Sequence, residues 1–412
     1  MMRWRAPAVL TGAVLLAQLA HVQPIVDVVT GAPPADVHLS YPLAHVLLAP
    51  LTLVADWLNG GSRGDLTGFA AWAVCVYALW RLLRGDASSL KREAIALAIF
   101  VLGFGAFVLW GALGARPIPR LVASDSSLIV FDPHSHTSLS HDGRTGFGSR
   151  ENAAWHRHAG FDAAFVTDHN EFGAAAAWRH DRAGRPPRLL DGEELSLSGL
   201  HIVALGNTAR IANEPWNRSW DSSLALLHLL STPTRSDLQP APLPPYLIAS
   251  LPEYWRHHWG SDIGALASSG IEGFEIWTTS PQAMDFPPAA RASVIARGTL
   301  EHKTLFGATD MHGLGYAATV WNVARLPGWR RLDDSALTRA LIERFRTEGP
   351  RANRVIALRR WQATSRLGVA AAIPVNAVLL LRAASRAHAL ALIGWCWLPL
   401  GVVSARRRRR SP

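Results

Sequence analysis

Residues 128–143 of this 412-residue chain are LIVFDPHSHTSLSHDG, an apolar run followed directly by a cluster of polar side chains. The run Leu128 to Phe131 has the β-branched and apolar composition of a short buried strand. Asp132, His134 and His136 follow at once, so the polar residues lie where the strand is expected to end. The same order of features recurs along the centre of the chain: an apolar run, polar residues and a helical stretch. This recurrence is typical of a β/α array.

Seven apolar runs of this kind predict seven strands. Helical stretches such as Glu151 to His158 and Ala336 to Thr347 separate several of them. We therefore expect an α/β fold over residues 125–349, a distorted seven-stranded β/α barrel related to the TIM fold and flanked by transmembrane helices. The predicted strands are Leu128 to Phe131, Ala163 to Val166, Arg188 to Leu190, Ile202 to Leu205, Leu247 to Ala249, Gly273 to Trp277 and Leu305 to Gly307.

Groups of His, Asp and Glu recur at or beside the ends of these predicted strands. Catalytic groups of such barrels collect at the carboxyl ends of the strands. The clusters are therefore expected to lie together at that end of the barrel. A single short His-x-His or Asp-x-His pattern occurs often by chance, but four clusters in strand context indicate a metal centre. Imidazole and carboxylate ligands suit Zn, Mn or Fe. The clusters are Asp132-Pro-His134-Ser-His136, Asp168-His169, Glu193-Glu194 and Asp310-Met-His312.

Four segments resemble the motifs of the PHP (polymerase and histidinol phosphatase) family of metal-dependent phosphoesterases, in the order in which the family has them. DPHSHTSLSHDG (132–143) is similar to the first motif and AGFDAAFVTDHN (159–170) to the second. DGEELSLSGLHIVALG (191–206) is similar to the third, and FGATDMHG (306–313) to the last. The resemblance covers about half of the chain and implies a PHP-type barrel that hydrolyses esters with divalent metal ions.

The resemblance also implies two to three metal ions per chain. In the tripeptide GEE, Glu194 rather than Glu193 matches the Glu of the family's G-x-E pattern, and it would bridge two ions. Asp168 is expected to be a structural partner of the site, because the family's ligand is the His that follows it. By site, the implied ligands are His134, His136, Glu194 and Asp310; then Asp142, His169 and His312; and finally Glu194 with His201.

The segment YLIASLPEYW (246–255) departs from the family pattern. There the family usually has a His before the Pro, as a further ligand of the metal that Glu194 and His201 share. This chain has Leu251. Three outcomes stay open: the enzyme works with two metals, His257 or His258 fills the gap, or the site has lost its activity.

The chemistry implied by such a centre is hydrolysis, because divalent metals activate water and polarise a phosphoryl or carbonyl oxygen. His201 and Arg144 are the candidate catalytic residues. A guanidinium can donate hydrogen bonds to two phosphate oxygens. A solvated position in a loop explains Arg144 equally well. The expected substrate is a small-molecule or nucleotide-like phosphoester. The alternatives are a carboxylester or amide hydrolase on the same scaffold, and a catalytically impaired metal-binding membrane sensor or scaffold.

Apolar residues make up 49% of the chain, and most of the excess lies before Ala115 and after Leu367. Ala94 to Ala115 carries no charge and matches the ~20 residues that cross a bilayer. We expect about four transmembrane helices in residues 1–115, a hairpin in residues 367–404 and a basic tail in residues 405–412, although any one shorter run could be a buried core helix. The shorter runs are Ala6 to Ala20, Tyr41 to Leu58, Leu66 to Trp80, Leu367 to Leu381 and Ala389 to Ser404.

Cysteine content and charge limit the kinds of site and partner that the sequence predicts. Cys75 and Cys396 lie in apolar runs near opposite ends of the chain, so neither a disulfide framework nor a thiolate zinc site is expected. The net charge of +10 comes largely from arginines that flank the apolar runs, and no basic patch indicates nucleic-acid binding. The distribution of Lys and Arg predicts a multi-pass protein of the inner membrane, in contact with the bilayer, with a cytoplasmic enzyme domain. Loss of one N-terminal span would reverse this orientation.

Overall fold

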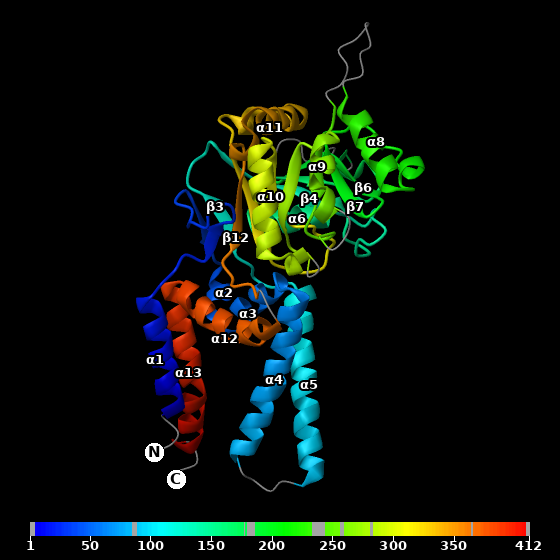
Figure 1. Cartoon of the computed structure of the whole chain (residues 1–412). Helices are drawn as coiled ribbons and strands as arrows, with labels where there is room; N and C mark the ends of the chain where they lie inside the picture. The colour runs from blue at the N-terminus through cyan, green and yellow to red at the C-terminus, as the bar shows by residue number, and fades with distance from the viewer. Residues whose placement is uncertain are drawn as a thin grey trace.

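The computed structural model describes residues 5–84, 89–176, 178, 186–232, 244–255, 259–280, 283–363 and 366–408. A curved sheet with helices around it forms one body of the molecule, and long helices extend from one end of that body (Figure 1). Helices α1 (Arg5–Leu19) and α13 (Arg386–Arg408) come from opposite ends of the chain and pack side by side, with the Trp397 Nε1 donating to the Thr11 hydroxyl at 3.0 Å.

In the described part of the chain, ten strands form one mixed sheet in the order β1-β12-β11-β4-β5-β6-β7-β8-β9-β10. The strands β4, β5 and β6 are parallel, as are β8, β9 and β10, whereas β7 is antiparallel to both of its neighbours. The sheet curves into a half-barrel, and a bridge between Ser135 and Met311 joins the polar ends of β4 and β10. The bounds are β1 Ile25–Asp27, β4 Leu128–Ser135, β5 Ala163–Val166, β6 Arg188–Leu197, β7 Leu200–Leu205, β8 Tyr246–Ser250, β9 Gly273–Thr278, β10 Thr304–Ala308, β11 Val320–Arg325 and β12 Arg354–Leu358.

The prediction of a seven-stranded TIM-type barrel is wrong, although the α/β class holds. All seven predicted runs are strands, but a tight turn at Ser198-Gly199 folds β7 back along β6, where a TIM barrel needs a helical crossover. Gly199 has a φ of 73°, which glycine adopts without strain. The strands β1, β11 and β12 were missed because they are short and pair across long stretches of sequence, as Ile25 does with Leu358.

Helices cover the half-barrel, and α11 (Asp334–Glu348) closes the end of it that faces away from the long helices (Figure 1). Leu337, Leu341 and Phe345 of α11 pack against Phe131 and Phe306 of the strands. This apolar plug leaves the carboxyl ends of the strands, on the opposite side, for polar side chains. The other surrounding helices are α6 Ser149–Ala159, α8 Trp220–Ser231, α9 Trp259–Ser268 and α10 Pro288–Leu300, with 3₁₀ turns at Glu214–Trp216, Ala283–Asp285, Trp329–Arg331 and Gly349–Arg351.

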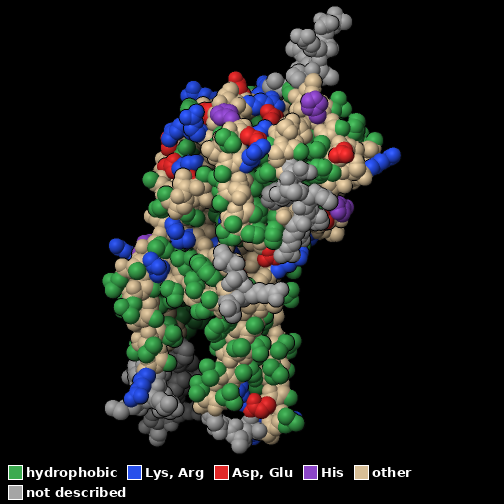
Figure 2. Space-filling view, viewed as in Figure 1, with side chains coloured by type: hydrophobic (Ala, Val, Ile, Leu, Met, Phe, Trp, Pro, Cys, Tyr) green, Lys and Arg blue, Asp and Glu red, His purple; other side chains and the backbone are tan. Residues whose placement is uncertain are grey.

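Two described helices, α4 (Arg63–Arg84) and α5 (Leu90–Leu113), are each long and apolar enough to cross a membrane, and little of either is buried. At 1.5 Å per residue they are about 33 and 36 Å long, which exceeds the ~30 Å of a hydrocarbon core. Figure 2 shows hydrophobic side chains over the visible surface of these helices. The helices α12 (Arg366–Ala383) and α13 meet at a bend of 117°, so together they make at most one broken span.

The other expected spans are shorter than a bilayer requires. The interval predicted as the second span is divided between α2 (Leu43–Leu47) and α3 (Ala49–Asn59), and α1 has 15 residues. Within the described ranges, two helices, or three if the bent pair is one span, meet the requirement. The first 115 residues also supply β1 to the large sheet, and β2 (Val37–Ser40) to a small one with β3 (Arg120–Ala123). Four N-terminal spans, the C-terminal hairpin and a cytoplasmic enzyme domain stay predictions.

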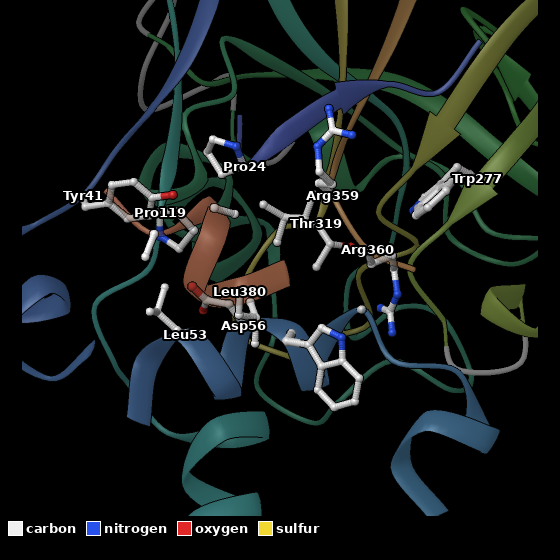
Figure 3. A pocket seen from close by; sticks show the side chains of 15 residues that line it. Pro24, Tyr41, Leu53, Asp56, Pro119, Trp277, Thr319, Arg359, Arg360 and Leu380 are labelled. Atoms are coloured by element: carbon white, nitrogen blue, oxygen red, sulfur yellow. The ribbon is translucent and has the colours of Figure 1, made fainter. Parts of the chain in front are cut away.

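Hydrogen bonds and an ion pair join the half-barrel to the helices α3, α4 and α5. The backbone N of Gly315 donates to the carbonyl of Ala112 at the end of α5, at 2.9 Å. The side-chain oxygen of Asn59, the last residue of α3, accepts from the backbone N of Ala317 at 3.0 Å. A buried ion pair joins Arg360 after β12 to Asp65 of α4, at 2.6 Å. Figure 3 shows a small cavity at this junction, with the Arg360 and Asp56 side chains on its wall.

Candidate metal centre

The carboxyl ends of the strands bring together all eight residues predicted as metal ligands. They form three overlapping groups, and the candidate ligand atoms of each group lie within 4.8 Å of one another. Four of the eight residues are buried, three are partly buried and Asp142 is exposed, so most of the centre lies inside the protein. Along the chain, His134 is the second-last residue of β4 and His136 follows the strand. Asp142 lies in the next loop, His169 follows β5, Glu194 lies in β6, His201 in β7, and Asp310 and His312 follow β10.

The first group consists of His134, His136, Glu194 and Asp310. The two Nε2 atoms of the histidines are 2.9 Å apart, and Glu194 Oε2 is 3.0 Å from the first and 3.2 Å from the second. Asp310 Oδ1 lies 3.4 and 3.2 Å from the same two nitrogens. Four lone-pair atoms therefore converge on one small buried volume.

This convergence fits a cation better than it fits hydrogen bonding. Among the described residues, Glu194 Oε2 has no partner in hydrogen-bond geometry, although imidazole nitrogens surround it. His312 Nε2 is also buried without such a partner in that part of the chain. Buried polar atoms are nearly always satisfied, so atoms aimed at a common point without hydrogen bonds indicate a site that can hold a cation. Nitrogen and carboxylate donors in this number suit Zn, Mn or Fe.

The second group adds His136 to the three predicted residues Asp142, His169 and His312. Asp142 Oδ2 lies 3.3 Å from His169 Nε2 and 3.1 Å from His312 Nε2. The rings of His136 and His312 are stacked, with centroids 3.9 Å apart. The Nδ1 of His312 lies 2.8 Å from the Asp310 carbonyl, and donation there leaves Nε2 with its lone pair directed at the group. The side chain of Asp142 is 42% exposed, so the centre opens to its surroundings at this residue.

The third group consists of His169, Glu194 and His201. His201 Nδ1 lies 3.0 Å from Glu194 Oε1, whereas the other oxygen of Glu194 faces the first group. Leu251, at the position where a His was expected, is completely buried in an apolar cluster. The hydroxyl of Tyr254, three residues on, lies 2.8 Å from His201 Nε2. His257 and His258 lie outside the described residues.

Electrostatics link the groups through Glu194. Burial would raise the pKa of this carboxyl, but His134, His169 and His201 hold it well below its usual range. Burial would likewise lower the pKa of the His312 imidazole, but Asp310 and Asp142 raise it to about 9. Carboxylates and imidazoles thus stabilise each other's charged forms when no cation is bound. The carboxylates of this centre therefore attract positive charge, which a divalent ion supplies in place of protons.

Two buried carboxylates lie behind the candidate ligands, and sequence reasoning gave neither of them an individual role. Glu275, fully buried in β9, lies 2.8 Å from His134 Nδ1 and accepts from the Ser250 hydroxyl at 2.7 Å. Such a partner fixes the tautomer of a metal-binding histidine. The signal was present, because a Glu at the centre of the apolar run GFEIWT must be paired if that run is a buried strand. Asp132, noted only as part of a cluster, accepts from the Thr309 backbone N at 3.2 Å and lies 3.0 Å from His156 Nε2.

Asp310 has a left-handed backbone, with a φ of 50°, which is uncommon outside glycine. Its backbone N donates to the His134 carbonyl at 3.0 Å, so the loop after β10 is tied to the end of β4. Asp adopts this conformation at a lower cost than most residues, and such geometry is concentrated at functional sites. The conformation places the Asp310 carboxylate against the two histidines of β4.

The remaining predicted residues lie around the centre. Asp168 accepts from the Thr137 hydroxyl at 2.8 Å, so it holds the loop after β4 in place. Glu193 points away from the ligand groups and accepts from the Ile211 backbone N at 2.8 Å. Arg144 is exposed at the rim, where its guanidinium donates to the Gly313 carbonyl at 3.3 Å.

A scan against protein-family models found no match, and a search of curated proteins also found none. Several solved structures align with this chain, including the following three. A protein from Bifidobacterium adolescentis, provisionally named a metal-dependent phosphoesterase, shares 17% identity over 46% of this chain and 88% of its own, with a TM-score of 0.31. PsfC from Pseudomonas syringae shares 16% identity over 61% and 99%, with a TM-score of 0.35. An amidohydrolase from Chromobacterium violaceum shares 16% identity over 50% and 98%, with a TM-score of 0.32. Because these scores are low, the proposal below rests on the side chains of the centre.

Proposed function

We propose that the chain is a membrane-anchored, metal-dependent phosphoesterase of PHP type. The observation that carries the proposal is the convergence of imidazole and carboxylate atoms at the ends of the strands. His134, His136, Glu194 and Asp310 present four donors within one sphere, and Asp142, His169, His201 and His312 extend it to both sides. The order of the four sequence motifs along the chain supports the same proposal.

The residues of this chain have separate tasks in hydrolysis. Divalent ions bound here supply Lewis acidity and a nucleophile from water at neutral pH. Glu194 directs one oxygen to the first group and the other to His201, so one carboxylate can serve two ions. Glu275 holds the His134 imidazole in a fixed orientation, and Asp132 accepts from the backbone N of Thr309, next to Asp310. Arg144, at the open rim beside Asp142, is placed to meet a phosphate that enters there.

The third metal is proposed to bind more weakly than the other two. His169 and Glu194 are shared with the other groups, which leaves His201 as the ligand that belongs to this site alone. Its Nε2 faces the Tyr254 hydroxyl, and Leu251 adds no donor. We therefore expect about two tightly held ions per chain and a third that exchanges.

The test is to purify the full chain in detergent, measure its metals by mass spectrometry, and assay it with two ester classes. Release of phosphate from phosphomonoesters or phosphodiesters, with no turnover of 4-nitrophenyl acetate, is expected. The opposite pattern would assign a carboxylester or amide hydrolase. A protein that holds its metals and hydrolyses neither class would be a metal-binding sensor or scaffold.

Membrane anchoring is tested separately. We expect the full chain to stay in the membrane fraction after a carbonate wash, because α4 and α5 expose apolar side chains along most of their length. A reporter fused after Pro412 is expected to be cytoplasmic. Release by carbonate would rule out the anchor, and an external reporter would reverse the proposed orientation.

A further inference from the structure

The candidate metal centre opens into a cavity of about 700 Å³ that has two chemically different walls. One wall is polar and includes Asp142, Glu253, Asp310 and His312. The opposite wall is apolar and comes from the two helices that are able to cross a membrane. Its residues on α4 are Leu66, Phe69 and Ala70, and those on α5 are Phe104, Val108, Gly111 and Ala112.

A second cavity, of about 780 Å³, continues from the first along α4 and α5. Phe69 lines both cavities, so the two cavities adjoin at this side chain. The second cavity is lined almost wholly by apolar and aromatic groups, among them Ala73 and Val76 of α4 and Ile99 of α5. The two cavities together lead from the ligand residues to the surface that α4 and α5 would present to a bilayer.

The position of the centre relative to the bilayer follows from the contacts at the helix ends. The loop that carries Asp310 and His312 continues to Gly315, whose backbone N donates to the Ala112 carbonyl in the last turn of α5. A bilayer around the apolar length of α5 would therefore end close to the metal centre. Figure 1 shows the half-barrel directly over the ends of α4 and α5.

The space between α4 and α5 suits a thin, flexible occupant. Aromatic pairs bridge the two helices, with ring centroids of Tyr77 and Phe100 at 4.5 Å and those of Phe69 and Phe104 at 5.6 Å. A helix of a partner protein, about 10 Å across, cannot pass between side chains that are in contact. An acyl chain can lie along such a groove, and it gains free energy from apolar contact without any hydrogen-bonding requirement.

We infer that the substrate is an amphiphilic phosphate ester, a lipid whose phosphate reaches the candidate metal centre while its acyl chains lie in the groove along α4 and α5. This inference rests on the proposed phosphoesterase function and names its substrate class. In the reaction, the oxygen of water forms a bond to phosphorus and the bond from phosphorus to the ester oxygen breaks. The proton from water goes to the leaving lipid alcohol, and no electrons are exchanged with another reactant. The phosphate leaves through the rim at Asp142.

The first test compares two phosphomonoesters with the same head and different chains, dioleoyl phosphatidic acid and dibutanoyl phosphatidic acid, on the full chain in detergent micelles. We expect kcat/KM to be at least tenfold higher for the dioleoyl lipid. Ala73→Trp, which fills the cavity between the helices, should lower the ratio of the two kcat/KM values at least tenfold. Ala71→Trp is the matched control, because Ala71 is exposed on the same helix and lines neither cavity. Its ratio should equal that of the natural chain in the same micelles.

The second test measures binding without turnover, so it does not depend on a folded and active Ala73→Trp variant. The natural chain, stripped of metal and then reloaded, is irradiated with a phosphatidic acid that carries a diazirine in its acyl chain. We expect labelling at Phe69, Ala73 and Tyr77 to exceed that at the outward-facing Val74 and Leu79. Diacylglycerol with the same photoreactive chain should not show this preference, because it has no phosphate to engage the centre.

The outcomes separate the inference from the function on which it rests. Equal kcat/KM for both chain lengths, with a ratio unchanged by Ala73→Trp, would overturn the lipid inference and leave the phosphoesterase function intact. If neither probe is hydrolysed but the cavity face is labelled only by the lipid with a phosphate, the phosphoesterase function is overturned. The cavity is then still supported as a lipid site. Labelling that is equal for both lipids and both helix faces would overturn the lipid site.

Discussion

Among the described residues, two buried clusters of histidines and carboxylates have different hydrogen-bonding patterns. One is the candidate metal centre. The other, which we call the base network, lies under the half-barrel and consists of Ser385, His388, His45, Asp56 and Arg116. Composition alone does not distinguish them, since both contain imidazoles and carboxylates that are almost inaccessible.

The base network is a chain of single hydrogen bonds. The Ser385 hydroxyl lies 2.7 Å from His388 Nδ1, and His388 Nε2 lies 3.0 Å from His45 Nδ1. His45 Nε2 lies 2.8 Å from Asp56 Oδ2, and the other oxygen of Asp56 accepts from Arg116 at 2.5 Å. Each ring nitrogen has one partner, so these hydrogen bonds and one Arg–Asp ion pair satisfy the whole network. It needs no added ion.

The metal centre has the opposite arrangement. Its nitrogens and oxygens converge on shared points, and Glu194 Oε2 faces three imidazole nitrogens without making a hydrogen bond among the described residues. Convergent donors indicate a cation, whereas sequential donors and acceptors indicate a structural polar network. The predictions below test this difference, from the largest expected effect to the smallest.

Removing a ligand from the metal centre should have the largest effect. His169→Ala takes away an imidazole that belongs to two of the ligand groups. We expect hydrolysis to fall by more than about 100-fold and the metal content to drop by at least one ion per chain. Metal analysis and phosphate release measure this, and the exposed His158→Ala is the control. A variant that keeps both full metal content and activity would contradict the assignment.

Breaking the base network should cost stability without loss of metal. Asp56→Ala leaves the buried Arg116 guanidinium without its carboxylate partner, and such a change destabilises by about 3–5 kcal/mol. Thermal unfolding in detergent should show the loss, while metal content per folded chain stays the same. If the folded variant loses metal instead, then the two clusters are not independent.

Glu275→Gln should weaken metal binding without removing a ligand. The amide cannot hold His134 Nδ1 as a carboxylate does, and the loss of such an orienting partner lowers metal affinity about 10–100-fold. Titration of the stripped protein should show weaker binding, with full occupancy recovered at higher metal concentration. Glu272→Gln, on the same strand segment but paired with Arg346, is the control. If Glu275→Gln binds metal with unchanged affinity, Glu275 does not orient His134.

Metal removal should reveal a pH dependence that the base network does not share. The pKa of His312 is about 9 in the folded chain without metal, above its unfolded value of 6.5. The protonated imidazole therefore stabilises the metal-free fold fully below pH 6.5, and this contribution is lost as the pH rises through 9. The melting temperature of the stripped protein should fall by about 2–4 °C over that range. The melting temperature of metal-free His312→Gln should fall less over the same pH range. An equal fall in both proteins would show that groups other than His312 cause it.

The local parts of this structure were predictable from sequence. The β-branched runs became strands, and the histidines and carboxylates that follow them became neighbours, because parallel strands bring their carboxyl ends to one edge. That rule needs no knowledge of strand order. The long uncharged run after Ala94 became α5 for a similar reason, since composition over ~20 residues decides whether a helix suits a bilayer.

Long-range pairing was not predictable, and it decided the rest. The order of the ten strands depends on partners such as Ile25 and Leu358, and no local pattern encodes which distant segment a strand will meet. The same holds for Glu275, which acquires its role only because β9 passes behind His134.

Sequence by itself determined which residues gather at the candidate metal centre, because ligand type and strand-end position are properties of a few consecutive residues. Only the tertiary structure decided what surrounds that chemistry. It placed the Tyr254 hydroxyl rather than a residue at position 251 against His201, and it set the ends of α4 and α5 across a cavity from the metal centre. Those relations depend on contacts between segments far apart in the chain, and such contacts form only when the whole sheet and its helices pack together.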